Sequence, residues 1–356
     1  MRKIAIVAAM VAVLCSPRQA SAYSVLAHEA NIDALWDTTI APMLQARFPE
    51  ATAAEIVEAR AYAYGGCVIQ DLGYYPFGSH VFSNLLHYVR TGDFVHALIS
   101  DALDIDEYAF ALGALGHYAA DNSGHPMAVN RAVPLMYPKL RAEFGDAVTY
   151  AQAPKNHVLV EFSFDVVQVA AGAYAPAAYH SYIGFKVAKP ALERAFRATY
   201  GIEMSDLFLS EDLAIATYRH AVGTTIPEMT KVAWTRKRDR LFLESFTLAR
   251  ERFRQSLDAL QAGRLHLPNT NFDTGKPTVR DEYPLADATY DELLDTLARR
   301  AFADVPDALS ANIVAYYGDA DPSPESDPGR QKRSTTIQSQ VASLKAACAC
   351  PRVPPP

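Results

Sequence analysis

The chain has 356 residues, of which 50% are hydrophobic and 21% charged, and its formal net charge is -7. Phosphate binding normally needs clustered lysine and arginine, so this acidic balance disfavours a stable complex with nucleic acid. With only four cysteines, a chain of this length must rely on a buried core rather than on a disulfide framework.

The first 22 residues have the features of a secretory signal peptide. Two basic residues precede the apolar run IAIVAAMVAVL, and residues 20–22 (ASA) supply the small side chains of a cleavage site. We expect cleavage after Ala22, a mature chain that begins at Tyr23, and a secreted or periplasmic protein. Removing the three basic residues of this segment takes the net charge from -7 to -10. Lipoprotein processing at Cys15 is the lesser alternative, because a leucine precedes that cysteine where a small residue is required.

Helical periodicity dominates the rest of the chain, and alternating strand patterns are scarce. We therefore expect an all-α fold, with a single large multi-helix domain over residues 23–317 and a linker and disordered tail over 318–356. Residues 268–290 are rich in Pro, Asn, Asp and Thr and predict a long loop. No later apolar run has the length of a membrane span. The expected helices cover residues 28–48, 101–121, 157–174, 212–261 and 290–318.

The stretch GALGHYAADNSGHPMAVN, residues 113–130, places His117, Asp121 and His125 at intervals of four. Side chains four apart on a helix lie on the same face, so the three would project into one volume. This is a metal-ligand geometry. The alternative is a core histidine that is hydrogen-bonded to a neighbouring carboxylate.

A second pair with the same spacing, His157 and Glu161, occurs on another predicted helix. Glu161 stands between Val160 and Phe162, and charged residues are rarely buried unless they are paired or bind a metal. Two such pairs on separate helices favour a metal site over two independent local hydrogen bonds.

Further candidates lie between the leader and the first pair. Asp71 follows a glycine pair and precedes a turn, so its carboxylate could point inward, although capping a helix is the alternative. His87 lies on an apolar helical segment, and His80 is the alternative for the same role. Three aromatic residues follow Asp71 closely enough to line a substrate pocket: Tyr74, Tyr75 and Phe77. Core packing is the alternative for these aromatics.

Signal cleavage would create one more ligand. The new α-amino group of Tyr23 would lie five residues before His28. Such a group has an ordinary pKa of about 8 and can therefore lose its proton to a metal and bind it as a neutral nitrogen.

Together these motifs resemble the superfamily of zinc-dependent phospholipases C and fungal single-strand-specific nucleases, whose three-zinc site uses the mature N-terminus, five histidines, two aspartates and a further carboxylate. The resemblance covers residues 23–165. Glu161 resembles the phospholipase branch, because the nucleases carry Asp there. One departure concerns His125, which comes two positions earlier than the last histidine of the family pattern Asp-x-x-x-Pro-x-His, so we expect the chain to take another path there.

The resemblance implies two or three Zn²⁺ ions at the bottom of a cleft. It places Asp71, His87, His117 and Asp121 on the first ion, His125, His157 and Glu161 on the second, and the amino group and carbonyl of Tyr23 with His28 and a bridging Asp121 on the third.

The same resemblance implies hydrolysis of a phospholipid to diacylglycerol and a phosphorylated headgroup. Clustered zinc ions activate water and neutralise a phosphodiester, and Asp71 would orient the attacking water or accept its proton. A single-strand-preferring nuclease of the same superfamily is one alternative. A secreted helical scaffold with structural metals and no turnover is another. The oligomeric state is not indicated by the sequence.

Overall fold

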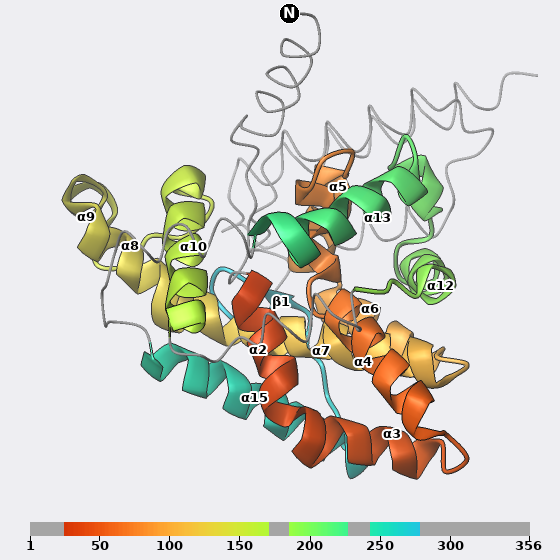
Figure 1. Ribbon diagram of the computed structural model, residues 1–356. Coiled ribbons are helices and arrows are strands. Elements are labelled where there is room, and N and C mark those ends of the chain that lie inside the picture. Colours follow the sequence, from red (N-terminus) through yellow and green to blue (C-terminus); the bar gives the residue numbers. More distant parts are fainter. Residues whose placement is uncertain (1–24, 171–184, 227–242, 278–356) are drawn as a thin grey trace, which may run out of the picture.

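The computed structural model describes residues 25–170, 185–226 and 243–277, and these residues form helices and one short β-hairpin (Figure 1). The predicted all-α fold is confirmed. In chain order the elements are α2 (Val25–Leu35), η1 (Trp36–Ile40), α3 (Ala41–Arg47), α4 (Ala53–Gly66), η2 (Ile69–Tyr74), α5 (His80–Tyr88), α6 (Thr91–Ser100), α7 (Ile105–Gly124), η3 (His125–Val129), α8 (Asn130–Met136), α9 (Pro138–Phe144), α10 (Pro154–Ala170), α12 (Lys189–Tyr200), η5 (Met204–Asp206), α13 (Glu211–His220), η6 (Ala221–Thr225), α15 (Leu243–Gln261), β1 (Thr270–Asn271) and β2 (Lys276–Pro277).

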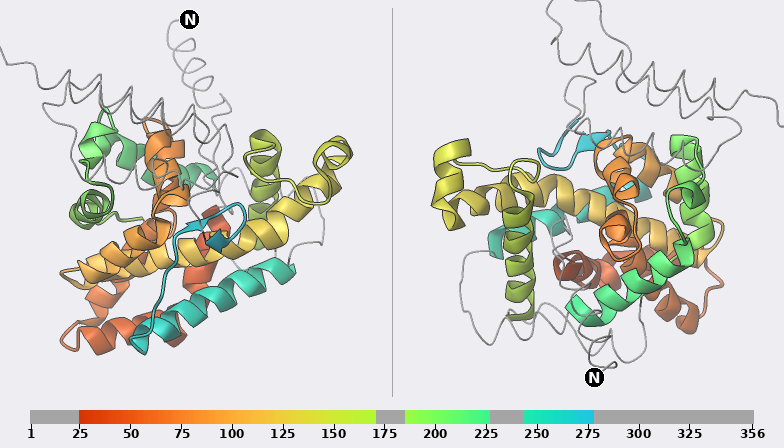
Figure 2. Two further views of the ribbon diagram at one scale, coloured as in Figure 1. Left: turned by 180° about the vertical axis from the view of Figure 1, so that it is seen from behind. Right: turned by 90° about the horizontal axis from the view of Figure 1, so that it is seen from above.

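Helix α7 is the central element, and α4, α15, α6 and α2 pack around it (Figures 1 and 2). It begins after Asp104, whose side chain accepts a hydrogen bond of 2.8 Å from the backbone N–H of Glu107 and so satisfies a free donor of the first turn. The helix is rich in alanine and glycine, which allows neighbouring helices to approach closely. Its buried length therefore carries His117 and Asp121 into the interior of the domain.

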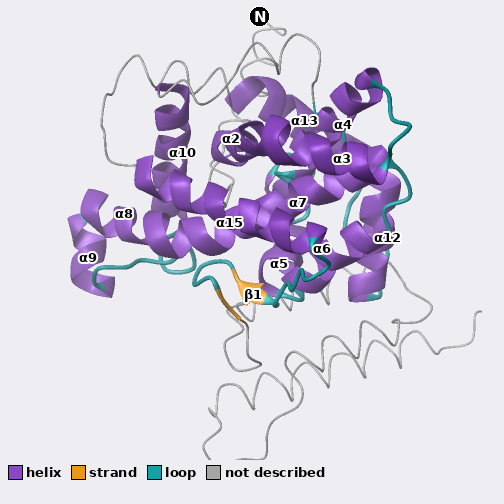
Figure 3. Ribbon diagram, turned by 90° about the horizontal axis from the view of Figure 1, so that it is seen from below, coloured by secondary structure: helices purple, strands orange, loops and turns teal. Residues whose placement is uncertain are grey.

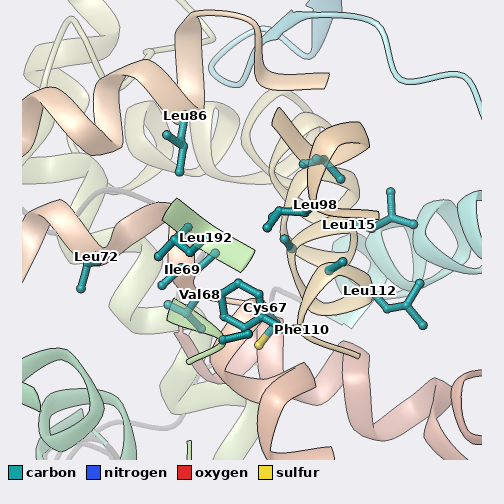
Figure 4. Close-up of a cluster of buried hydrophobic side chains, with 14 of the residues drawn as sticks. Cys67, Val68, Ile69, Leu72, Leu86, Leu98, Phe110, Leu112, Leu115 and Leu192 are labelled. Atoms are coloured by element: carbon teal, nitrogen blue, oxygen red, sulfur yellow. The ribbon is translucent and has the colours of Figure 1, made fainter. Parts of the chain in front are cut away.

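Two glycines set the crossing of α4 and α7. A Cβ at Gly66 would lie 2.0 Å from the carbonyl oxygen of Phe110, and a Cβ at Gly113 would lie 2.1 Å from that of Ala63. Any larger residue at either position would push the helices apart. Beside this crossing, aliphatic and aromatic side chains from α4, α6, α7 and α12 form a continuous core, part of which is drawn in Figure 4.

The predicted helices differ from the observed ones mainly at their ends. The helix expected over residues 28–48 is three successive helical segments, α2, η1 and α3, and the one expected over 101–121 begins at Ile105 and continues to Gly124. None of the helices in the described part of the chain combines the length and the apolar composition that a membrane span requires. The leader, Tyr23, both predicted domain boundaries, the helix expected over 290–318 and the tail lie outside the described residues.

The predicted loop over 268–290 is wrong at its start, where β1 and β2 form an antiparallel hairpin with Thr270 opposite Pro277 (Figure 3). Each strand has two residues, too few for an alternating pattern to be seen in the sequence. The backbone N–H of Thr270 donates to Thr91 Oγ1 at 2.9 Å, and Tyr118 Oη donates to the carbonyl of Pro268 at 2.6 Å. The hairpin is thereby fixed to α6 and α7.

Candidate metal centre

The predicted ligands within the described residues gather in one buried cluster. None has more than 4% of its surface exposed. They come from α2 (His28), η2 (Asp71), α5 (His87), α7 (His117, Asp121), η3 (His125) and α10 (His157, Glu161). The predicted cleft above this cluster stays a prediction.

Two histidines of the cluster are held by main-chain carbonyls. His87 Nδ1 lies 2.7 Å from the carbonyl oxygen of Ser83, and His117 Nδ1 lies 3.0 Å from that of Cys67. A carbonyl oxygen only accepts, so each Nδ1 carries a proton, and in the neutral ring, which is the form that binds a metal, each Nε2 then carries a lone pair. The two Nε2 atoms face each other at 3.2 Å. Neither can donate to the other.

Carboxylate oxygens surround the same point. Asp121 Oδ2 lies 3.1 Å from His117 Nε2 and 3.4 Å from His87 Nε2, and Asp71 Oδ1 lies 3.4 Å from His87 Nε2. Within the described part of the chain, neither oxygen of Asp121 nor Oδ1 of Asp71 has a hydrogen-bond donor. On the other side, Asp121 Oδ1 lies 3.3 Å from His28 Nε2. Lone pairs and anionic oxygens converge without a donor, an arrangement that a divalent cation satisfies.

In the second set of ligands, too, acceptor atoms face each other, but here a side chain and not a main-chain carbonyl orients the histidine. Asn130 Nδ2 donates to the carbonyl oxygen of Asp273 at 2.6 Å, so Asn130 Oδ1 faces His157 Nε2 at 2.7 Å and accepts its proton. His157 Nδ1 then has only a lone pair, and it lies 2.6 Å from Glu161 Oε1. Again two acceptors meet, and a cation between them would relieve the contact.

His125 completes this second set from the end of α7. Its ring stacks on that of His157, with centroids 5.1 Å apart and planes at 3°. Its Nδ1 lies 3.9 Å from Glu161 Oε1, and its Nε2 lies 3.7 Å from Asp121 Oδ1. The chain continues from α7 as the π-helical turn η3 and does not break into a loop, so a residue four positions after Asp121 keeps the same face.

We call His28, Asp71, His87, His117 and Asp121 the first group, and His125, His157 and Glu161 the second group. Asp121 contacts histidines of both.

Burial favours the neutral form of three histidines of the centre, His28, His125 and His157. It lowers the pKa of His28 and of His157 to about 4 each, with His117 adding to the effect at His28. Burial likewise holds the pKa of His125 well below its usual range. Neutral imidazole is the form that binds a metal.

The two aspartates of the first group behave differently. Burial, together with the charge of Asp121, raises the pKa of Asp71 well above its usual range. Burial alone would raise the pKa of Asp121 too, but attraction to His117 and contacts with His28 and His87 hold it well below its usual range. Asp121 is therefore the permanent anion of the centre, and Asp71 is the carboxylate able to take up a proton.

Three residues near the cluster carried no functional signal in the sequence. Asp273, in the turn of the hairpin, places a carboxylate oxygen within 4.8 Å of ring nitrogens of His125 and His157. Asp165 accepts hydrogen bonds from the backbone N–H groups of Leu26 and Ala27 at 2.9 and 3.3 Å, which fixes the start of α2 against α10. Asn130 orients His157. Each acts on a segment distant in sequence, so only the fold reveals it.

Comparison with known proteins agrees with this chemistry. The profile of the family described as zinc dependent phospholipase C matches residues 35–209. The match covers 175 of the 356 residues and supports the family that the sequence motifs resemble. The search of curated proteins and the search of solved structures each returned no match.

Some of the site residues lie inside the range matched by the zinc-dependent phospholipase C family, and others lie outside it. Asp71 and the ligands from α5, α7, η3 and α10 lie inside it, whereas His28 and Asp273 lie outside. His87 stands in the cluster. The alternative histidine, His80, begins α5 and packs its ring against Tyr74 at 5.5 Å.

The predicted pocket aromatics separate into three environments. The ring of Tyr74 lies 6.0 Å from that of His87, beside the first group. The ring of Tyr75 packs edge-on against Tyr218 at 5.3 Å within the hydrophobic core. Phe77 is 52% exposed and has a φ of 65°. Of the three, Tyr74 is the one placed against a candidate ligand.

Proposed function

We propose that the protein is an exported zinc-dependent phosphodiesterase of the phospholipase C type, which hydrolyses a phospholipid to diacylglycerol and a phosphorylated headgroup. The observation that carries this proposal is the convergence of unprotonated imidazole nitrogens and donor-free carboxylates at one buried point in a chain that matches this family. Nitrogen and oxygen ligands without a cysteine suit zinc.

Each side chain has a role in this proposal. Asp71, His87, His117 and Asp121 bind the first ion, and the second group binds another. His28 and Asp121 would share the third with the amino group and carbonyl of Tyr23. Bound zinc lowers the pKa of water and neutralises charge on a phosphodiester.

Asp71 orients the attacking water and accepts its proton. Its pKa is raised by burial, and its Oδ1 lacks a hydrogen-bond donor among the described residues, so the proton has a place to go. The backbone carbonyls of Ser83 and Cys67 keep His87 and His117 in the tautomer that faces the ions. Tyr74 packs on the His87 ring and limits its rotation.

Export and signal cleavage form part of the proposal. His28 lies in the first turns of α2, whose initial N–H groups are held by Asp165. Cleavage after Ala22 would leave the amino group of Tyr23 five residues before His28. A variant that retains residues before Tyr23 should bind one zinc ion fewer by elemental analysis, and full zinc content in that variant would refute the N-terminal ligand. N-terminal sequencing of protein recovered outside the cytoplasm tests the cleavage site.

The activity is tested with zinc-loaded protein on phosphatidylcholine and, separately, on single-stranded DNA. We expect release of diacylglycerol and phosphocholine that stops with chelator and returns with zinc. Hydrolysis of DNA alone would assign the protein to the nuclease branch. No hydrolysis of either substrate or of bis(p-nitrophenyl) phosphate, together with a chelator-induced fall in melting temperature, would leave a metal-stabilised scaffold.

A further inference from the structure

Asp273 lies beyond the residues matched by the family, yet it reaches the centre of the domain. It occupies the turn between β1 and β2 and is 2% exposed. The ring of Phe272, its neighbour, lies 4.9 Å from that of His87 and 4.6 Å from that of His125, so the hairpin touches both groups of ligands. A segment that follows the last described helix thus forms part of the wall of the metal centre.

The main chain of Asp273 is fixed on both sides. Its N–H donates to Asn271 Oδ1 at 2.9 Å, and its carbonyl accepts from Asn130 Nδ2 at 2.6 Å. The same Asn130 holds His157 through Oδ1. One amide side chain therefore positions both Asp273 and His157.

The carboxylate of Asp273 accepts hydrogen bonds, including one from the backbone N–H of Ala151, but it has no cationic side chain beside it among the described residues. Oδ1 accepts from the N–H of Tyr150 at 2.8 Å, while Oδ2 has a long contact of 3.4 Å with Tyr88 Oη. A buried carboxylate that stays ionised is normally paired with a cation or bound to a metal.

The neighbouring side chains, His125 and His157, indicate that the partner is a metal ion. Ligand atoms of Asp273, His125 and His157 all lie within 4.8 Å of one another. Two ligand atoms that each lie about 2.0–2.2 Å from one zinc ion are at most about 4.4 Å apart, so a shift of a few tenths of an ångström is enough for all three to bind. We propose that Asp273 is a further carboxylate ligand of the ion held by His125 and His157. This inference rests on the zinc centre proposed above and adds a ligand from outside the family-matched residues.

The test compares Asp273→Asn with the parent protein. Asparagine keeps the acceptor for Tyr150 and the side-chain shape but binds zinc poorly. We expect at least about a 10-fold weaker affinity for one zinc ion, with the other ions retained, in competition with a chelator followed by elemental analysis. Asp146→Asn is the matched control, because the Asp146 side chain is 83% exposed and pairs with Arg141.

Thermal unfolding distinguishes ligation from a structural role. In excess chelator, Asp273→Asn should melt at or slightly above the parent temperature, since an unpaired buried charge has been removed; in zinc it should gain less than the parent does. An equal fall in melting temperature with and without zinc, or an unchanged zinc affinity, would overturn the proposal.

A crystal structure of the zinc-loaded parent provides a second measurement that no folding defect affects. Anomalous scattering should place an ion about 2.0–2.2 Å from an oxygen of Asp273. An ion on His125 and His157 that lies more than about 3 Å from both oxygens would also refute the ligand. Failure of the parent to bind zinc would instead overturn the proposed function.

Discussion

The two groups of the metal centre are built from similar residues but are held in different ways. In the first group, His87 and His117 are oriented by the main-chain carbonyls of Ser83 and Cys67. In the second group, His157 is oriented by the side chain of Asn130. A carbonyl survives any substitution of its residue, whereas an amide side chain does not. The orientation of His87 and His117 therefore depends on the backbone, whereas the orientation of His157 depends on one particular side chain.

The groups also differ in where their carboxylates come from. Asp71 and Asp121 lie within the family-matched residues, while Asp273 is brought to the second group by a hairpin beyond them. Asp121 links the two, with contacts to His117 and His125. Changes in one group should therefore leave the other intact unless they touch Asp121.

The largest effects should follow loss of a ligand. His117→Ala should abolish phosphodiester hydrolysis and remove zinc from the first group while the second group still binds. Asp121→Ala should abolish activity and reduce zinc in both groups, because its oxygens face histidines of each. Zinc content and turnover measure both effects. His266→Ala, at an exposed position, is the control and should match the parent. Activity or zinc content that is the same in all three variants would contradict the assignment.

Acid should destabilise the metal-free protein through one histidine in each group. Unfolded histidine binds a proton near pH 6.5, but folded His28 and His157 do so only at about pH 4. Between these values the unfolded chain binds more protons, so the free energy of unfolding falls as the pH is lowered. Each histidine contributes a loss of up to roughly 3 kcal/mol over this window.

Urea unfolding in chelator, repeated from pH 7 to pH 4, measures this loss. His28→Gln and His157→Gln should each flatten the profile. Because Asp71, whose pKa is raised, has the opposite pH dependence, the comparison is between variant and parent: a variant profile parallel to that of the parent would show that the folded histidine takes up its proton as readily as the unfolded one.

The orienting residues provide the sharpest test of the comparison. Asn130→Ala should weaken the affinity for one zinc ion by about 10- to 100-fold, which is the usual effect of removing a group that orients a metal ligand. Cys67→Ala keeps the carbonyl that holds His117, so zinc affinity should be unchanged while packing loss destabilises the fold by about 1 kcal/mol. Equal zinc affinities in the two variants would remove the distinction between the groups.

The smallest effect concerns the unpaired carboxylates in metal-free protein at pH 7. Asp71→Asn should raise the free energy of unfolding by about 1–3 kcal/mol, because burial disfavours its charged form. Since its pKa is raised, this penalty grows as the pH rises through that pKa. Asp273→Asn should raise the free energy of unfolding by less, because Tyr150 and Tyr88 already donate hydrogen bonds to Asp273. Urea unfolding in chelator ranks the two, and the reverse order would contradict this account of their surroundings.

The parts of the centre that the sequence predicted are those governed by local geometry. His117 with Asp121, and His157 with Glu161, are each four residues apart on a helix, so one period of the helix was enough to place them on a common face. The all-α fold followed from the same periodicity. His125 also keeps this face, because η3 continues the helical path.

The parts that the sequence did not predict depend on contacts between distant segments. Asp273 joins His157 across more than a hundred residues, and its two-residue strands leave no pattern to read. Asp165, in α10, accepts a hydrogen bond from a backbone N–H group at the start of α2, so its capping role has no local signature in the sequence. Such residues become visible only when the chain has been folded.

The first described helix supplies His28, and the turn of the hairpin at the end of the described residues supplies Asp273. Their donors meet only when these two segments, far apart in sequence, have come together. A chain that has not been synthesised as far as the hairpin lacks Asp273, so the complete ligand set can assemble only late in folding.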